Sequence, residues 1–563
     1  MTTAAAPLVR PKASRDDLIM RGGLVLFAAV LLVIVALPLW SLLSKSFQDH
    51  NGNFIGFANY LRYVQTPALF QSFWNSLFIA VVTTSIVVPL AFVYAYALTR
   101  SCMRFKALLQ GLALIPILAP SLLPALSLIY LFGNQGLLKG WLFGQPVYGP
   151  VGIVAAQVFY CFPHALMILV TALSMADQRL YESADALGAS RLRKFLTVTL
   201  PGAKYGLIST SFVIFTLVIT DFGIAKVVGG RFNVLATDIY KQVIGQQNFS
   251  MGAVVGMVLL APAALAFVVD RLVQRKQVAL LTARAVPLVP RPKFARDAAF
   301  TVFCVVISLG ILTILGMAIW GSLIKYWPYN LSLTWDNYMF EKFDANGWES
   351  YYNSLRMAAG AAIFGTALTF IGAWLNEKTR GFTYWRALVQ LLAFLPMAVP
   401  GLVLGLGYIF FFNAPNNPLN FLYATMGILV INTVAHFYTV GHLTATTALK
   451  QIDPEFESVS ASLKVPIWRT FGRVTAPICL PSILDIAIYL FVNAMTTVSS
   501  VIFLYAPDTK LASVAAVNIE EAGTTAAAAA LCVVIVVTSA AVKALHLIAD
   551  RYLLSRLQGW RRR

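Results

Sequence analysis

The 563-residue chain has few charged residues and few of the side chains that build metal or disulfide sites. Charged residues make up only 12% of it, against roughly one quarter in soluble domains, whereas hydrophobic residues make up 59%. No Cys-x-x-Cys pair occurs, and the five cysteines lie in apolar stretches or beside basic segments. This pattern argues against a zinc ribbon and a disulfide framework. The mean hydropathy of +0.75 indicates a membrane protein in a lipid bilayer.

The chain also lacks a phosphate-binding loop. Walker-type loops need a Gly-Lys pair before Ser or Thr, and no Gly-Lys dipeptide occurs anywhere in the sequence. Nothing resembles a positioned nucleophile with its base, so we expect no enzyme and no catalytic residue. We expect no cofactor in this chain either, and any ATP and Mg²⁺ must be bound by a partner.

Long apolar runs predict an all-α, polytopic fold. A helix needs about 20 mostly apolar residues to cross a hydrocarbon core about 30 Å thick. Segments of this kind predict about twelve transmembrane helices, at 22–43, 77–97, 108–132, 151–175, 206–229, 251–270, 298–321, 355–375, 385–411, 424–447, 480–503 and 524–548.

The basic residues indicate how these helices are oriented. If the N-terminus is cytoplasmic, the inner segments hold 31 of the 42 Lys and Arg residues and the outer segments hold nine. Cytoplasmic loops of membrane proteins carry such an excess. We therefore predict that both termini are cytoplasmic, and the net charge of +19 needs no nucleic-acid partner.

The chain repeats itself at a shift of 276 to 280 residues, which is a known transporter architecture. We predict a first transmembrane domain at 1–275, a cytoplasmic linker at 276–297 and a second transmembrane domain at 298–563. The aligned matches are Asn59-Tyr60 with Asn337-Tyr338, Asn75-Ser76 with Asn353-Ser354, Thr99-Arg100 with Thr379-Arg380, and Pro116 and Pro120 with Pro396 and Pro400.

The four paired prolines have two interpretations. Each proline could simply kink its helix while neighbouring helices satisfy the freed carbonyl. Alternatively, the prolines distort two helices that line a transport pathway at corresponding depths. Their repetition in both halves slightly favours the second interpretation.

The most informative segment is 177–201, between the fourth and fifth spans. Its first part predicts a short helix that stops at Gly188, because glycine supplies the left-handed backbone that ends helices. Ser190 is placed to cap a second short helix, and Pro201 suits the first turn of the next span. The segment therefore predicts a stiff helical elbow in the cytoplasm.

This elbow resembles the coupling loop of ABC importer membrane subunits, with the pattern Glu-Ala-Ala, three residues, Gly, nine residues and Ile-x-Leu-Pro. The resemblance covers nearly the whole chain and narrows to fused, two-in-one permeases similar to those for ferric iron, polyamines, thiamine and 2-aminoethylphosphonate. The residues that it assigns to ATPase coupling are Glu182, Ala184, Gly188, Leu200 and Pro201, with Ser183 in the second position.

The resemblance implies a type I ABC importer membrane fold of two parallel six-helix repeats in the bacterial inner membrane. It also implies two copies of a separate ATPase that dock on the elbows and a periplasmic substrate-binding protein. ATP-driven closure of the ATPases would tilt the two bundles and open the path outward.

A degraded copy of the elbow lies at 453–477 in the second half. A serine stands at the glutamate position, a lysine stands at the glycine position, and a glutamate lies one residue early. We expect Pro466 to force the turn that Gly188 permits in the first copy. Our hypothesis is that both elbows bind ATPases and that the first is the stronger contact. The coupling residues expected in this copy are Glu457, Ser458, Lys464 and Pro477.

Charged residues at the end of the fifth span indicate a substrate pathway. Because burying ionisable groups in a membrane costs several kcal/mol, Asp221, Lys226 and Arg231 should face a cavity or each other. In one interpretation Asp221 pairs with a base elsewhere and organises the helix bundle. In the other, Asp221 attracts the ammonium group of a substrate while Lys226 or Arg231 attracts its phosphonate. The matching stretch of the second half is polar but uncharged, and it contains Thr497 and Ser499.

The residues 221–249 look most like putative 2-aminoethylphosphonate permeases, so this zwitterion is the substrate that we expect. Ferric iron is the alternative, with polyamines or thiamine behind it, because related fused permeases carry them. No metal site is expected in the permease, since the binding protein would hold the metal. The membrane histidines His164, His436 and His442 are more often packed than functional.

A proton-coupled or facilitative carrier is a competing class, because six-plus-six parallel repeats describe that group too. The elbow between the fourth and fifth spans argues against it. So does the absence of a Gly-x-x-x-Asp-Arg signature between the second and third spans.

Overall fold

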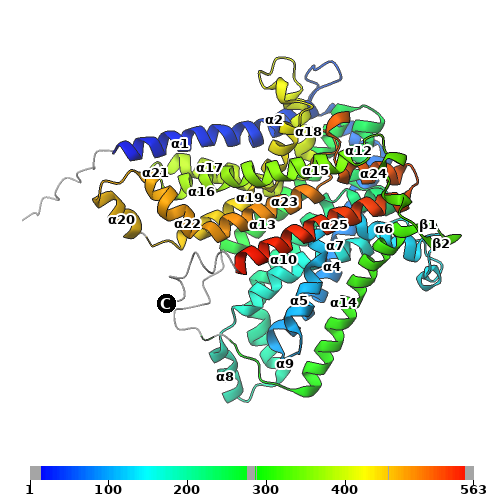
Figure 1. Cartoon of the computed structure of the whole chain (residues 1–563), viewed down its shortest axis with the longest axis horizontal. Helices are drawn as coiled ribbons and strands as arrows, with labels where there is room; N and C mark the ends of the chain where they lie inside the picture. Colours follow the sequence, from blue (N-terminus) through cyan, green and yellow to red (C-terminus); the bar gives the residue numbers. More distant parts are fainter. Residues whose placement is uncertain (1–13, 276–285, 287, 454, 552–563) are drawn as a thin grey trace, which may run out of the picture.

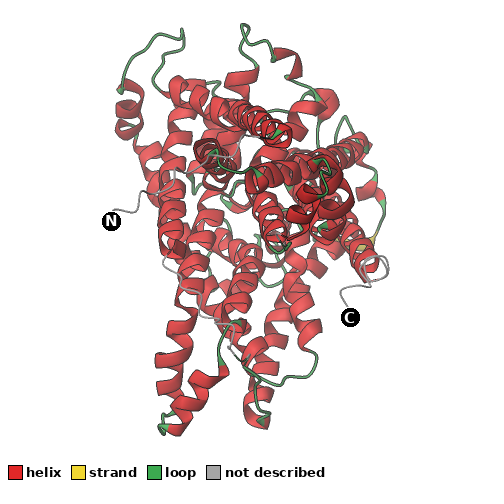
Figure 2. Cartoon of the chain, turned by 90° about the vertical axis from the view of Figure 1, so that its left-hand side faces the viewer, coloured by secondary structure: helices red, strands yellow, loops and turns green. Residues whose placement is uncertain are grey.

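The computed structural model describes residues 14–275, 286, 288–453 and 455–551. In these residues the chain is almost wholly helical (Figures 1 and 2). The described strands are β1 (Ile324–Tyr326) and β2 (Asn330–Leu333), which form one short antiparallel hairpin.

The described residues form nine helices that are long and apolar enough to cross a membrane, and three bent helix pairs raise the number to twelve if each pair is one span. Their positions correspond to the twelve predicted spans. In the first half they are α1 (Arg15–Leu31) with α2 (Leu37–Ser46), α4 (Pro67–Arg100), α5 (Lys106–Leu114) with α6 (Leu122–Phe132), α7 (Pro150–Ser174), α9 (Arg191–Lys194) with α10 (Leu200–Thr220), and α13 (Phe249–Arg275). In the second half they are α14 (Phe294–Leu323), α15 (Glu349–Gly360) with α16 (Thr366–Lys378), α17 (Thr383–Ala398) with α18 (Gly401–Phe412), α19 (Met426–Lys450), α21 (Ile467–Thr470) and α22 (Ala476–Ile478) with α23 (Leu480–Thr496), and α25 (Thr525–Ala549).

Short helices connect these spans. They are α3 (Ala58–Gln65), α8 (Gln178–Ala186), α11 (Gly223–Val228), α12 (Leu235–Tyr240), α20 (Glu455–Ser462) and α24 (Ala512–Glu521). Half of the predicted linker, residues 276–285 and 287, lies outside the described residues, and α14 begins at Phe294, inside the predicted linker range.

The predicted spans that contain the paired prolines are broken. The two parts of the third span, α5 and α6, meet at an angle of 102°, and the parts of the ninth span, α17 and α18, meet at 116°. Pro120 and Pro400 stand at these breaks, where proline cannot donate a backbone hydrogen bond. The prolines therefore redirect two helices at corresponding depths.

The fifth and eleventh spans are shorter than predicted at their C-terminal ends. Predicted limits of 206–229 and 480–503 are wrong there, because the helices end at Thr220 and Thr496. The next residues, Asp221 and Thr497, are extended, with ψ of 134° and 137°. The two halves thus interrupt this span at the same aligned position.

The two repeats exchange their first helices. Helix α1 packs on α16 and α17 of the second half, and α14 packs on α4, α5 and α6 of the first half as well as on α25 of its own half. Figure 1 shows the result as two helical arms that diverge toward one side, with α8 at the end of one arm and α20 at the end of the other. We call this side the coupling side and the opposite side the outer side.

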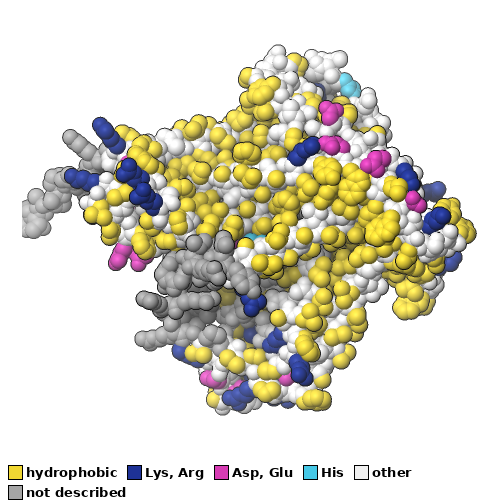
Figure 3. All heavy atoms as spheres, viewed as in Figure 1, with side chains coloured by type: hydrophobic (Ala, Val, Ile, Leu, Met, Phe, Trp, Pro, Cys, Tyr) yellow, Lys and Arg dark blue, Asp and Glu magenta, His cyan; other side chains and the backbone are white. Residues whose placement is uncertain are grey.

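Surface colouring agrees with a membrane-spanning molecule. In Figure 3 hydrophobic side chains cover the flanks of both arms, whereas many Lys, Arg, Asp and Glu side chains gather near the ends. Such an apolar flank suits contact with lipid tails.

Candidate coupling loops and transport cavity

The first elbow has the local structure that the sequence predicts. Helix α8 ends before Gly188, whose φ is +67°. The Ser190 hydroxyl accepts a hydrogen bond from the backbone N–H of Arg193 and so caps α9. Pro201 lies in the first turn of α10. The elbow is therefore a helix–turn–helix that leads directly into the fifth span.

The second elbow has the same backbone turn without a glycine. Lys464 itself adopts the left-handed conformation, with φ of +54°. The Val465 N–H donates to the carbonyl of Ser460, as the Ala189 N–H does to the carbonyl of Ala184 in the first elbow. Pro466 stands at the N-cap of α21, the place of Ser190, so the residue with the left-handed backbone in this turn is Lys464.

The glutamates of the two elbows have different surroundings. Glu182 is exposed, and its carboxylate accepts a hydrogen bond of 2.6 Å from the Gln178 amide. Glu457 instead turns toward its own bundle and forms an ion pair with Lys378, whose side chain is only 12% exposed. At the position of Glu457 the first elbow has Tyr181, and the Arg100 guanidinium lies over its ring at 5.5 Å.

The remaining candidate coupling residues are either exposed or packed against their own arm. Ala184 is buried, Pro477 lies in the short helix α22, and Ser183 and Ser458 are exposed. Leu200 begins α10. Glu182 and Ser458 therefore occupy equivalent outward positions, and Glu457 belongs to the contact between its elbow and the bundle.

A cavity of about 880 Å³ lies between the two halves. Its lining includes Asp270, Asp485 and Lys543 near the coupling-side ends of their helices, and it reaches Ser121 and Gly401 at the two proline breaks. The cavity thus runs from the coupling side to the depth of the breaks. Pro396 and Pro400 line it directly, which favours the pathway interpretation of the paired prolines.

The structure separates the predicted pathway residues. Asp221, Thr497 and Ser499 line the cavity. Lys226 lies elsewhere: its ammonium forms an ion pair with Glu521 of α24 and lies 4.4 Å from the centre of the Tyr240 ring.

Arg231 is exposed outside the cavity. Asp221 and the two cations therefore do not surround one ligand in this conformation. The Asp221 carboxylate accepts hydrogen bonds from the Gln157 amide at 3.1 Å and the Ile224 N–H at 3.0 Å.

Several lining residues were not singled out from the sequence as pathway residues. Tyr160 and His436 line the cavity at positions 276 residues apart, and the Nδ1 atom of His436 has no hydrogen-bond partner among the described atoms. His164 also lines it, whereas His442 is buried against the Tyr438 hydroxyl. The repeat offset is the sequence signal that could have identified Tyr160 and His436 as a pair.

No group of three or more His, Cys, Asp or Glu side chains gathers as a metal site in the described part of the chain. The cavity charges are dispersed, with the three carboxylates of Asp221, Asp270 and Asp485 against one ammonium, that of Lys543. This arrangement can attract a cation without holding it tightly.

A serine and a glycine meet at each helix break, in exchanged positions. In the first half a Cβ on Gly223 would lie 2.4 Å from the hydroxyl oxygen of Ser121. In the second half a Cβ on Gly401 would lie 2.5 Å from the hydroxyl oxygen of Ser499. Within the repeat offset of 276 to 280 residues, Ser121 corresponds to Gly401 and Gly223 corresponds to Ser499. Each break therefore has room for one serine side chain, which comes from a different segment in each half.

We expect Gly223→Ser to destabilise the protein by about 1–3 kcal/mol, since it overfills this contact. The double variant Ser121→Gly/Gly223→Ser should recover most of the loss, because it reproduces the arrangement of the second half. Thermal unfolding of the purified protein in detergent measures both. A double variant no more stable than Gly223→Ser would contradict the proposed exchange.

Comparison with known proteins agrees with the elbow and the repeat. Residues 88–278 match the family described as binding-protein-dependent transport system inner membrane component. A putative ferric transport system permease protein of Haemophilus influenzae is 26% identical over 532 residues, which cover 90% of this chain and 81% of that protein.

Two further relatives show how much of the chain is matched. The ferric transport system permease protein of Actinobacillus pleuropneumoniae is 27% identical over 473 residues, covering 80% of this chain and 66% of that protein. A spermidine/putrescine transport system permease protein of Haemophilus influenzae is 25% identical over 264 residues, covering 44% of this chain and 92% of that protein. Together with the twelve-span fold and the coupling elbow, these matches show that the chain has the type I fold of ABC importer permeases, and that residues 88–278 are similar to the binding-protein-dependent inner membrane component.

Proposed function

We propose that this permease carries a cationic solute into the cytoplasm, with ferric iron delivered by a periplasmic binding protein as the substrate. The observation that carries the proposal is the similarity to two relatives named for ferric transport. Their alignments extend over 90% and 80% of this chain and so include both fused halves. The spermidine/putrescine relative matches 44% of the chain, which makes polyamines the second candidate.

The cavity charges support a cation over a zwitterion. Carboxylates outnumber ammonium groups along the lining, and Lys226 is engaged with Glu521 away from it. A 2-aminoethylphosphonate would need a cation beside Asp221 to balance its phosphonate, and none of the three relatives described above is named for phosphonate transport. Ferric iron therefore replaces 2-aminoethylphosphonate, the substrate expected from the sequence, as the proposed substrate.

In the proposed mechanism, ATP binding by two separate ATPase subunits closes the coupling side and opens the outer side. Hydrolysis then restores the conformation described here, whose cavity extends from the coupling side. The ion pair between Lys226 of the first half and Glu521 of the second half crosses the outer side in this conformation. Outward opening must separate these two side chains.

The substrate proposal is tested with the periplasmic binding protein that pairs with this permease. We expect calorimetric titration to give tight binding of ferric iron and none of 2-aminoethylphosphonate. Uptake of radioactive iron by proteoliposomes containing the permease, its ATPase and the loaded binding protein is the matching transport assay. Selective binding of spermidine or putrescine would replace ferric iron with a polyamine.

The outer ion pair gives a separate prediction. Lys226→Met should raise ATP hydrolysis in the absence of binding protein by up to about fivefold, because a partly exposed pair contributes at most about 1 kcal/mol to closure. Glu521→Gln should act in the same way. The charge exchange Lys226→Glu/Glu521→Lys should return hydrolysis to the wild-type level, and a persistently high rate would show that the pair does not hold this side closed.

A further inference from the structure

The end of the segment that joins the two halves is attached to the first coupling helix. The backbone N–H of Gln178 donates to the carbonyl of Val286 at 2.9 Å, and the N–H of Val286 donates to the Asp177 carboxylate at 3.4 Å. The N–H of Val289 donates to the Gln178 amide oxygen at 3.3 Å. The same Gln178 side chain donates to Glu182, so it joins the linker to the exposed glutamate of the elbow.

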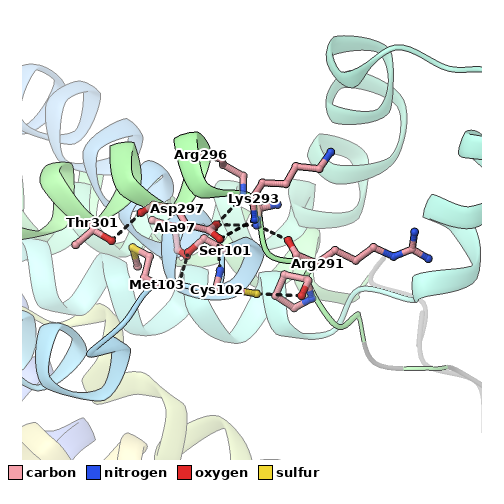
Figure 4. A network of polar contacts seen from close by, with 10 residues as sticks. Ala97, Ser101, Cys102, Met103, Arg291, Lys293, Arg296, Asp297 and Thr301 are labelled. Atoms are coloured by element: carbon pink, nitrogen blue, oxygen red, sulfur yellow. Dashed lines mark hydrogen bonds and ion pairs between the residues drawn. The ribbon is translucent and has the colours of Figure 1, made fainter.

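The linker is also fixed on its other side, where α14 begins (Figure 4). The Asp297 carboxylate accepts hydrogen bonds from the N–H of Cys102 and the N–H of Lys293, and it pairs with Arg296. The Cys102 thiol donates to the carbonyl of Pro290 at 3.1 Å. Residues 288–293 therefore have a defined path from the base of α14 to the start of α8.

This path places two unpaired cations beside the elbow. In Figure 4 the side chains of Arg291 and Lys293 extend away from the Asp297 network. Neither forms an ion pair with any residue in the described part of the chain. A hydrogen bond from Lys194, together with the charges of Arg291 and Lys293, holds the pKa of the nearby Asp185 on α8 below its usual value.

We propose that linker residues 288–293 form part of the surface that binds the ATPase at the first elbow, with Arg291 and Lys293 contacting carboxylates of that ATPase. The inference rests on the proposed function, because it takes α8 as the docking helix. The ATPase is the fitting partner because the linker is bonded to the start of α8, which lies at the end of its arm (Figure 1). Whatever protein seats on α8 meets these residues as well.

The second elbow is contacted by the start of α1 at another point. There the Asp16 carboxylate at the start of α1 accepts a hydrogen bond of 3.0 Å from the N–H of Ile467. Ile467 begins α21 and is equivalent to Arg191 at the start of α9, whereas the linker is bonded to the start of α8.

Charge reversal of the linker tests this surface. In the full-length permease in nanodiscs, Arg291→Glu/Lys293→Glu should weaken binding of the purified ATPase subunit by about tenfold, and wild-type binding should weaken as salt rises. The control Lys139→Glu/Lys325→Glu makes the same charge change in loops on the other side of the spans and should leave binding unchanged. Unchanged binding in the linker variant overturns the proposal, and so does a loss confined to binding of anionic lipid vesicles.

A labelling experiment gives a second readout that does not depend on how the charge variant folds. Val289 is 72% exposed, so Val289→Cys in a Cys102→Ser background should react quickly with a maleimide, and addition of the ATPase should slow this reaction several-fold. Phe143→Cys in the same background, 95% exposed in another loop, is the control. An unchanged rate at position 289 overturns the proposal.

Failure of the inference is distinguishable from failure of the proposed function. Ala184→Trp alters the buried face of α8 and should abolish ATPase binding if α8 is the docking helix. If the wild-type permease binds no ATPase, the proposed function fails. If Ala184→Trp abolishes binding while both linker experiments are negative, only the linker proposal fails.

Discussion

Glu182→Arg is expected to lower ATP-driven transport by about tenfold or more, whereas Ser458→Arg at the equivalent position of the second elbow should lower it less. Glu182 is exposed at the first elbow, so its carboxylate is available to a docked ATPase. Truncation of a hot-spot residue in an interface costs about 2 kcal/mol or more, and a reversed charge adds repulsion. Substrate uptake by proteoliposomes and ATPase co-purification measure the effect.

Glu457→Ala is the informative comparison. This carboxylate pairs with Lys378 inside the second arm, so its loss should lower the thermal stability of the permease and affect ATPase binding only indirectly. Lys378→Met/Glu457→Met should recover stability, because the pair is removed without leaving a partly buried charge unpaired. Equal losses of transport in Glu182→Ala and Glu457→Ala, without a loss of stability in either, would end the hypothesis of unequal elbows.

The backbone of the elbows could be predicted where it depends on local residues. Gly188, Ser190 and Pro201 each act within one or two turns of the chain, so their spacing was sufficient. The second elbow was harder, because Lys464 adopts a conformation that costs about 1 kcal/mol or more for a residue with a Cβ. Packing with neighbouring residues offsets this conformational cost, and single-residue preferences do not include such packing.

The spans were predictable because bilayer thickness imposes length and hydropathy, but the breaks at Asp221 and Thr497 were not. Apolar residues continue beyond both positions, and the breaks are recognised only from the backbone, which is extended at Asp221 and Thr497. The exchange of α1 and α14 between halves was equally hidden. Both packing faces are apolar, so composition does not distinguish one bundle from the other.

The pairing of Lys226 shows the same limit for the cavity. The sequence placed Asp221, Lys226 and Arg231 within eleven residues, which favoured one zwitterion site. The break at Asp221 and the short helix α11 turn Lys226 toward Glu521, a residue almost 300 positions later in the chain. Proximity along the chain therefore predicted the wrong partner for Lys226, because its partner lies in the other half.

Asp221→Asn should lower transport of the cationic substrate by about tenfold, since one full charge at the end of a low-dielectric cavity interacts with a nearby cation by more than 1.4 kcal/mol. The substitution keeps an amide oxygen that can accept from the Ile224 N–H, so the start of α11 is preserved. Thermal unfolding should therefore change little while uptake falls. A carboxylate with a purely structural role predicts the opposite pattern, a loss of stability with uptake retained in the folded fraction.

The repeat offers a matched rescue. Thr497 lines the same cavity at the position equivalent to Asp221, with the same extended backbone after its helix. Asp221→Asn/Thr497→Asp should therefore restore a substantial part of uptake, because it returns one negative charge to the same depth from the other half. Thr497→Val in the Asp221→Asn background changes the same position without a charge and should restore nothing. If attraction by net charge carries the substrate past the breaks, only the aspartate variant recovers, and recovery in neither variant would mean that Asp221 acts through its own hydrogen bonds.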